Sequence, residues 1–193
     1  MNEACERCGS TRVDNGTYCR PCLSFLTGEA WLLEAAKLMR CGEYDKAAER
    51  FGDALDMVPG CHLGEDDLPA LTPQLVALLW ADRPAEVLQV IEERDDGEDP
   101  DMPTAQGLAL LDLAQPLAAY EALDDACSRG ARDDVDALRT HLGILATGGD
   151  AVDLSAFWLS MARVRYEQGD WLHAAVCLRL GGGIPASLVS ASI

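Results

Sequence analysis

Four cysteines near the N-terminus constrain this chain more than any other feature of its sequence. They form two Cys-x-x-Cys pairs, Cys5/Cys8 and Cys19/Cys22. Two such pairs can supply four thiolates to one tetrahedral zinc ion with little backbone strain. Gly9 follows the first pair, where a tight turn benefits from a residue that readily adopts positive φ. The spacing predicts one structural zinc ion without an open coordination position. Two separate redox dithiols, or ordinary buried cysteines, are the alternatives.

The residues around these cysteines resemble a zinc ribbon or treble-clef finger. The resemblance rests on "CERCG", "YCRPCL" and the turn-like "DNG" at 14–16, and it implies a small zinc-stabilised module over residues 1–27. Similar fingers in small ribosomal-subunit proteins hold RNA among basic residues. Here residues 1–26 contain three arginines and three acidic residues, so their net charge is zero. The resemblance therefore does not imply RNA binding by this chain.

The chain is strongly acidic outside this module. Its formal net charge is −18 over 193 residues, and only two residues are lysines. A nucleic-acid-binding surface needs clustered basic residues to displace counterions, so the composition argues against nucleic acid as the partner. The acidity either attracts a basic partner or keeps the protein soluble, as in a salt-rich cell.

From residue 28 onward the apolar residues recur at helical spacing, and strand signals are lacking. Helices are expected over 29–40 and 44–58, with a turn at 41–43 between them. Further turns are expected near 82, 114 and 169, and an extra helix over 133–146. The segments 60–70 and 95–103 read as loops. The fold class predicted is therefore all-α.

The first helical pair resembles a tetratricopeptide repeat over residues 28–61. The matching residues are Trp31, Ala35, Leu38, Gly42, Glu43, Tyr44, Ala47, Phe51, Ala54, Leu55 and Pro59. Weaker copies occur at 100–133 and 158–175. The resemblance implies an α-solenoid of repeat-like hairpins over 28–180, which would offer an extended surface to another chain. A tail, 181–193, follows; poor order and docking of its apolar residues are the alternatives there.

No catalytic constellation is evident, because the three histidines His62, His141 and His173 are isolated in the sequence. The sequence therefore predicts a non-enzymatic adaptor that binds a partner protein. The alternative is a nucleic-acid-associated regulator of transcription or translation that uses the finger.

The sequence also shows which residues occupy the partner-binding positions of the first repeat. Some tetratricopeptide proteins clamp a partner's C-terminal carboxylates with polar residues of the first helix of each repeat. The matching positions here are Leu32, Ala36 and Met39, which are apolar. They are candidates for an apolar contact, either with the finger or with a partner.

A cytoplasmic protein without a membrane span is expected. The longest apolar run, Leu75–Ala81, is far shorter than the roughly 18 residues that a span requires. The N-terminal residues also lack the basic start and apolar stretch of a signal peptide.

Protein purified without added metal should contain about one zinc ion per chain, as elemental analysis would measure. Cys5→Ser should abolish zinc binding because it removes one of four ligands, whereas Cys41→Ser, outside the two pairs, should leave it intact. An iron–sulfur chromophore, or a metal-free protein with two disulfides, would contradict the zinc assignment.

Overall fold

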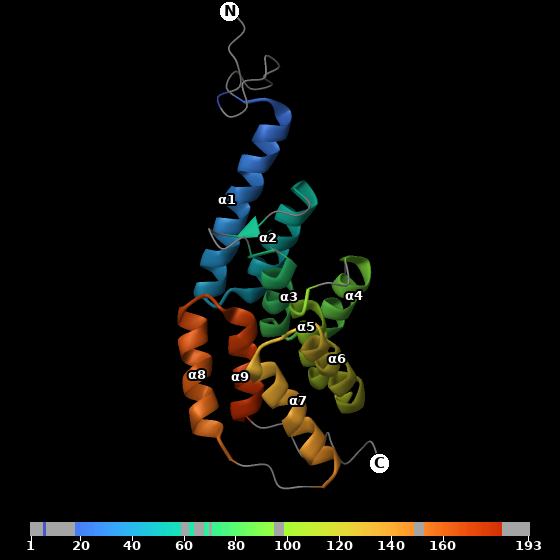
Figure 1. Ribbon diagram of the computed structural model, residues 1–193. Coiled ribbons are helices and arrows are strands. Elements are labelled where there is room, and N and C mark those ends of the chain that lie inside the picture. The colour runs from blue at the N-terminus through green and yellow to red at the C-terminus, as the bar shows by residue number, and fades with distance from the viewer. Residues whose placement is uncertain are drawn as a thin grey trace, which may run out of the picture. The chain divides into compact units, whose positions relative to one another are not determined.

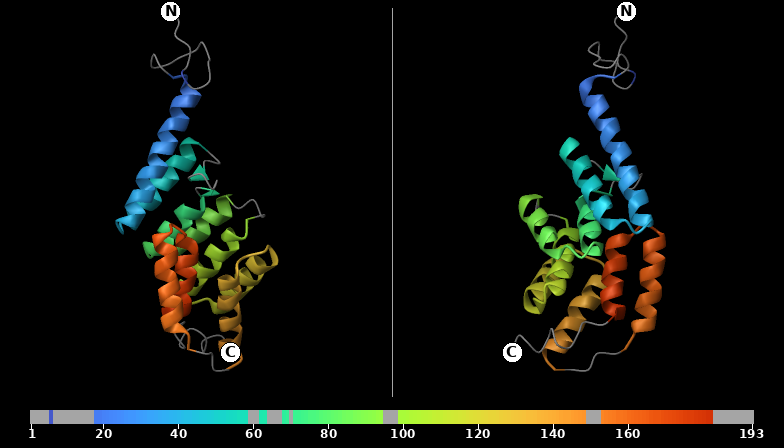
Figure 2. Two further views of the ribbon diagram at one scale, coloured as in Figure 1. Left: turned by 60° about the vertical axis from the view of Figure 1, so that its left-hand side comes forward. Right: turned by 180° about the vertical axis from the view of Figure 1, so that it is seen from behind.

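The computed structural model describes residues 6, 18–58, 62–63, 68–69, 71–94, 99–148 and 153–182. Within them the chain forms nine α-helices and two short strands (Figures 1 and 2). The helices are α1 (Arg20–Arg40), α2 (Tyr44–Met57), α3 (Leu71–Trp80), α4 (Pro84–Arg94), α5 (Asp101–Asp112), α6 (Pro116–Ser128), α7 (Asp133–Ala146), α8 (Ser155–Glu167) and α9 (Trp171–Gly182). This architecture confirms the predicted all-helical class. Contacts divide the chain into two compact units, Met1–Ala77 and Leu78–Ile193.

The first unit is built on the hairpin of α1 and α2. The two helices pack side by side (Figure 1) through small residues, and Ala35 and Ala47 are fully buried there. Phe51 is also fully buried. Small side chains let the helix axes approach closely, and the aromatic ring fills the space that remains. The burial of these three residues agrees with the repeat pattern read from the sequence.

Helix α1 begins earlier than the sequence indicated. It starts at Arg20, so the expected boundary between residues 27 and 28 lies inside the helix. Pro21 explains the early start, because its fixed φ suits the first helical positions and its missing N–H has no intrahelical role there. Cys19 occupies the N-cap position, and Cys22 lies in the first helical turn.

The segment 60–70, expected to be a loop, contains the two strands. Strand β1 (His62–Leu63) pairs antiparallel with β2 (Leu68–Pro69). Each strand has only two residues. Such a short pairing depends on backbone hydrogen bonds and leaves no alternating apolar pattern to read.

One type of turn recurs between successive helices. The residues with positive φ in these turns are Gly42, Asp82, Ala114, Gly130 and Gly169. In the first turn the N–H of Glu43 donates to the carbonyl of Leu38 at 3.0 Å, and in the last the N–H of Asp170 donates to Arg165 at 3.0 Å. These bonds satisfy carbonyls that a helix C-terminus leaves unpaired. Four of these turns lie where the sequence predicted them.

The second unit has α9 at its centre. Helix α9 contacts α8, α7 and α5, and most of its residues are buried. Helices α5 and α6 form another close pair, in which a Cβ atom on Gly107 would lie 2.7 Å from Cγ of Leu123. Figure 2 shows α8 and α9 side by side. Because α9 rather than α8 packs on α7, the helices of this unit do not follow a strictly consecutive stacking order.

Phe51→Ala should lower the free energy of unfolding by about 3–5 kcal/mol, because it opens a cavity in the α1–α2 contact. Leu33→Ala is the control: Leu33 is 70% exposed on α1, so its truncation should change stability by no more than about 0.5 kcal/mol. Denaturant unfolding with hydrogen exchange of residues 28–58 measures both. Wild-type protection in the Phe51 variant would show that this hairpin does not depend on the ring.

Candidate functional site

The predicted zinc ligands are only partly within the described residues. Cys5 and Cys8 lie outside them. Cys19 is buried and Cys22 is half-buried, both at the N-terminus of α1. A helix N-terminus favours an anionic thiolate, so this placement fits the donor chemistry of zinc. The described residues alone contain no group of three or more potential metal ligands. A four-cysteine site also needs Cys5 and Cys8, and zinc binding therefore stays a prediction.

The predicted partner-contact residues Leu32, Ala36 and Met39 are all buried on α1. Their side chains are covered by other parts of the chain, which agrees with an intramolecular apolar contact. A partner could reach them only after this covering moved. Their use by a partner stays a prediction.

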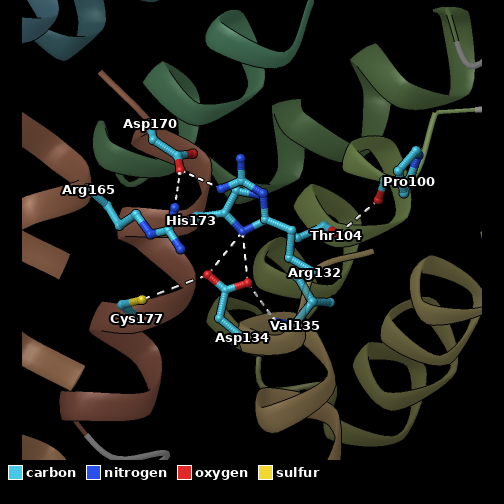
Figure 3. A network of polar contacts seen from close by, with 9 residues as sticks. All are labelled: Pro100, Thr104, Arg132, Asp134, Val135, Arg165, Asp170, His173 and Cys177. Carbon is cyan, nitrogen blue, oxygen red and sulfur yellow. Dashed lines mark hydrogen bonds and ion pairs between the residues drawn. The ribbon is translucent and has the colours of Figure 1, made fainter. Parts of the chain in front are cut away.

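A buried polar cluster joins α7 to α9 in the second unit (Figure 3). We call Asp134, His173 and Cys177 the Asp134 cluster. The side chains of His173 and Asp134 contact each other through Nδ1, which lies 3.0 Å from Oδ1 and 3.1 Å from Oδ2. Sγ of Cys177, one turn further along α9, lies 3.9 Å from Oδ2 of the same carboxylate. The exposed fractions are 7% for Asp134, 5% for His173 and 1% for Cys177.

The position of Asp134 on its helix supports its negative charge. It is the second residue of α7, and its Oδ1 accepts a hydrogen bond from the N–H of Val135 at 3.1 Å. Helix N-termini stabilise carboxylates, both through free N–H groups and through the helix dipole. The cluster therefore connects the start of one helix with one face of another.

A set of ion pairs adjoins the cluster at the turn between α8 and α9. Asp170 accepts from Arg165 of α8 at 3.0 Å and from Arg132, which precedes α7, at 2.5 Å. Figure 3 shows both guanidinium groups directed at this one carboxylate. The ion pairs link the α8–α9 turn to the beginning of α7, beside the Asp134–His173 contact.

The environment shifts the pKa values of two cluster members in opposite directions. Burial alone would raise the pKa of Asp134. The hydrogen bond and charge of His173, the charge of Arg165 and the Val135 N–H together outweigh this, so the pKa of Asp134 lies below its ordinary value. Burial, and next the Asp134 charge, raise the pKa of the Cys177 thiol to about 11.

The chemistry of the cluster is structural. A thiol, an imidazole and a carboxylate also occur together in thiol-dependent enzymes, where the imidazole takes the proton of the thiol. Here the ring and the thiol both face the carboxylate instead. A thiol with a pKa of about 11 is almost entirely protonated near neutral pH, so Cys177 is a poor nucleophile. We conclude that the cluster fixes α9 against α7.

From the sequence alone, His173 was interpreted as an isolated histidine. The missed signal is the i, i+4 spacing of His173 and Cys177 on a helix in which most of the other residues are apolar. That spacing places both on one face, where a polar partner is required if the face is buried. The partner, Asp134, lies 39 residues earlier in the chain. Of the cysteines outside the two pairs, Cys177 is buried and Cys41 is exposed.

Helix α8 carries the most conspicuous apolar surface of the second unit. Leu154, Phe157, Met161 and Val164 follow one another at intervals of three, four and three residues, which places them along one side of the helix. We call them the α8 stripe. Leu154 is 50%, Phe157 54% and Val164 43% exposed, and Met161 is half-buried. The only fully buried residue of α8 is Ala162. Exposed apolar surface of this kind is typical of interaction sites.

Comparison of the chain with known protein families, curated proteins and solved structures found no match. By its fold and surface, the protein is a helical-hairpin protein with an exposed apolar stripe. None of the helices described is both long and apolar enough to cross a bilayer.

Alkylation by iodoacetamide near pH 7.5 should leave Cys177 unmodified in the folded protein, because the thiol is buried and its pKa is about 11. Cys41, exposed after α1, is the internal reference and should react at least about 100-fold faster. Peptide mass mapping over time gives both rates. Equal rates would show that the Asp134 cluster is open to solvent.

Asp134→Ala should lower the free energy of unfolding by about 1–3 kcal/mol at pH 7, because the buried His173 ring would lose its hydrogen-bond partner. The loss should shrink in acid. Since the folded-state pKa of Asp134 is depressed, its contribution is complete above the ordinary carboxylate value of about 4 and disappears as the pH falls through the lower folded-state value.

The matched control is Asp136→Ala, which removes an exposed carboxylate 2.6 Å from Arg139 and should cost less than about 1 kcal/mol. Denaturant unfolding of the three proteins between pH 7 and pH 2 measures the difference. A wild-type advantage over the Asp134 variant that stays constant across this range would exclude the carboxylate charge as its origin.

Proposed function

We propose that this protein is a non-enzymatic adaptor that binds a partner protein through the α8 stripe. In this proposal the chain is a solenoid of tetratricopeptide-like hairpins, and the N-terminal segment is a finger that holds one zinc ion through Cys5, Cys8, Cys19 and Cys22. Zinc has a structural role and stabilises the N-terminal end of the helical array.

The observation that carries the proposal is the exposure of the α8 stripe. Phe157 alone leaves 54% of its surface in contact with water. Leaving an aromatic side chain exposed forgoes roughly 1.5–3 kcal/mol that its burial would contribute. Leu154 and Val164 are exposed to a similar extent on the same side of the helix. Together the three side chains leave apolar surface in water that binding of a partner would bury.

The repeat-like hairpins support the same function. Helix α8 and helix α9 match the resemblance at 158–175, and their turn has the geometry of the turn between α1 and α2. In tetratricopeptide repeats the first helix of each hairpin contributes to the surface that faces the bound chain, and α8 is the first helix of the last hairpin. With Trp158 aligned on Trp31, Leu159 takes the position of Leu32, so the α8 stripe lies on another side of this helix than the predicted repeat surface. The Asp134 cluster holds α9, and α9 in turn carries α8.

The alternative function, a nucleic-acid-associated regulator, receives less support. Residues 78–193 contain 20 acidic and 8 basic residues, which gives a net charge of −12. The phosphate backbone would be repelled by a surface of this charge. The acidic character instead favours a protein partner with basic groups.

Affinity purification from the native host tests the proposal, with each lysate split and one half treated with nuclease. Phe157→Asp should lose the partner because it places a charge in the apolar contact. Leu117→Asp is the matched control, since Leu117 is an apolar residue 59% exposed on α6. Wild type and the Leu117 variant should retain the same partner with and without nuclease.

Two outcomes contradict the proposal. A partner that disappears after nuclease treatment would favour the nucleic-acid-associated regulator. A partner retained equally by the Phe157 and Leu117 variants would place the binding surface outside the α8 stripe.

A further inference from the structure

The geometry of the α8 stripe points to the chemical class of its occupant: an amphipathic helix of another protein with basic residues at one end of its apolar face. This inference rests on the proposed function, because it specifies the partner segment bound at the same surface. It is carried by the spacing of the apolar residues, by the negative charge at the N-terminal end of the stripe and by the net charge of residues 78–193.

The spacing of the stripe is that of a helix–helix contact. Intervals of three, four and three residues from Leu154 to Val164 produce a narrow seam like the a and d positions of a coiled coil. Such a seam accepts the side chains of a second helix with the same periodicity. From residue 154 to residue 164 the seam is about 15 Å long, so about three turns of a partner helix would cover it.

Negative charge lies at the N-terminal end of the stripe. Asp153 directly precedes Leu154 and is exposed. Its Oδ1 accepts hydrogen bonds from Oγ of Ser155 at 2.6 Å and from the N–H of Ser155 at 3.0 Å. These bonds lower the pKa of Asp153, and its carboxylate is therefore charged at neutral pH. A lysine or arginine of a bound helix would complement this end.

The charges at the C-terminal end of the stripe balance one another. The dipole of α8 places partial negative charge there, and Glu167 is exposed in the last turn. The two arginines of α8 are already engaged, Arg163 with Glu167 at 3.0 Å and Arg165 with Asp170 at 3.0 Å. Arg163 and Glu167 thus balance each other, and the net negative charge beside the stripe is that of Asp153, so a partner with a cation at the matching end of its apolar face fits best.

Charge also argues against a second copy of this chain as the occupant. Each copy of residues 78–193 has a net charge of −12, and a symmetric pairing of two α8 helices would bring these charges together. A like-charged partner loses the electrostatic attraction that a basic helix gains. The uncharged segment 183–193 of the same chain is a further occupant that the experiment must distinguish.

Site-specific photo-cross-linking in the native host identifies the occupant. A benzoylphenylalanine replaces Phe157, a conservative change at an exposed ring, and in a parallel chain it replaces Leu117 as the control. Cross-linked peptides are mapped by mass spectrometry. The expected result is one protein cross-linked from position 157 but not from 117, through a segment with apolar residues at three- and four-residue intervals and lysine or arginine at one end.

A synthetic peptide of the mapped segment then tests the two features separately. Its affinity, measured by fluorescence anisotropy, should fall at least about tenfold for Phe157→Asp and stay unchanged for Leu117→Asp. Asp153→Asn should weaken binding about threefold and reduce its salt dependence, because it removes the negative charge at the N-terminal end of the stripe.

The outcomes that contradict this inference can be told apart from those that contradict the adaptor function. Cross-links to residues 183–193 or to a second copy overturn this inference, as does a mapped segment that is acidic or not helical when bound. If another protein is still cross-linked specifically in that last case, the adaptor function stands. Absence of any cross-link specific to position 157 overturns both.

Discussion

The buried carboxylate of Asp134 is the contact on which the arrangement of the second unit depends. A charged group with 7% exposure is costly unless hydrogen bonds compensate for its lost hydration. His173, the Val135 N–H and the N-terminus of α7 provide this compensation. Because these groups must lie at fixed positions around one carboxylate, α9 can pack on α7 in only one register. The cluster therefore specifies this register in addition to its contribution to stability.

The difference in burial between α8 and α9 follows from the packing of α9 on α7. Helix α9 lies among α5, α7 and α8, and its sequence is accordingly apolar on most sides. Helix α8 covers only one side of α9, so much of its own surface has no helix against it. Gly181 shows how close the two are, since a Cβ atom there would lie 2.8 Å from Cγ of Leu159. The stripe consists of Phe157, Met161 and Val164 of α8 together with Leu154, the residue that precedes the helix.

The sequence was most informative where structure depends on neighbouring residues. Turns at Gly42 and Gly169 followed from local chemistry, and helix α7 was expected over 133–146, as observed. Contacts distant in sequence left no such signal: Asp134 and His173 are 39 residues apart, and neither is unusual alone. The exposure of the α8 stripe could not be predicted from the sequence either, because helical periodicity identifies the apolar side of a helix but not the residues that cover it.

The acidity of the chain and the apolar stripe are physically connected. An exposed apolar seam promotes self-association unless another force opposes it. The net charge of −12 on residues 78–193 provides this force, because two copies repel each other at distances where apolar contact has not yet begun. The same field attracts a basic helix. In the proposed function, keeping copies of the chain apart and recruiting a basic partner, separate explanations when only the composition is considered, are two consequences of one charge distribution around one apolar surface.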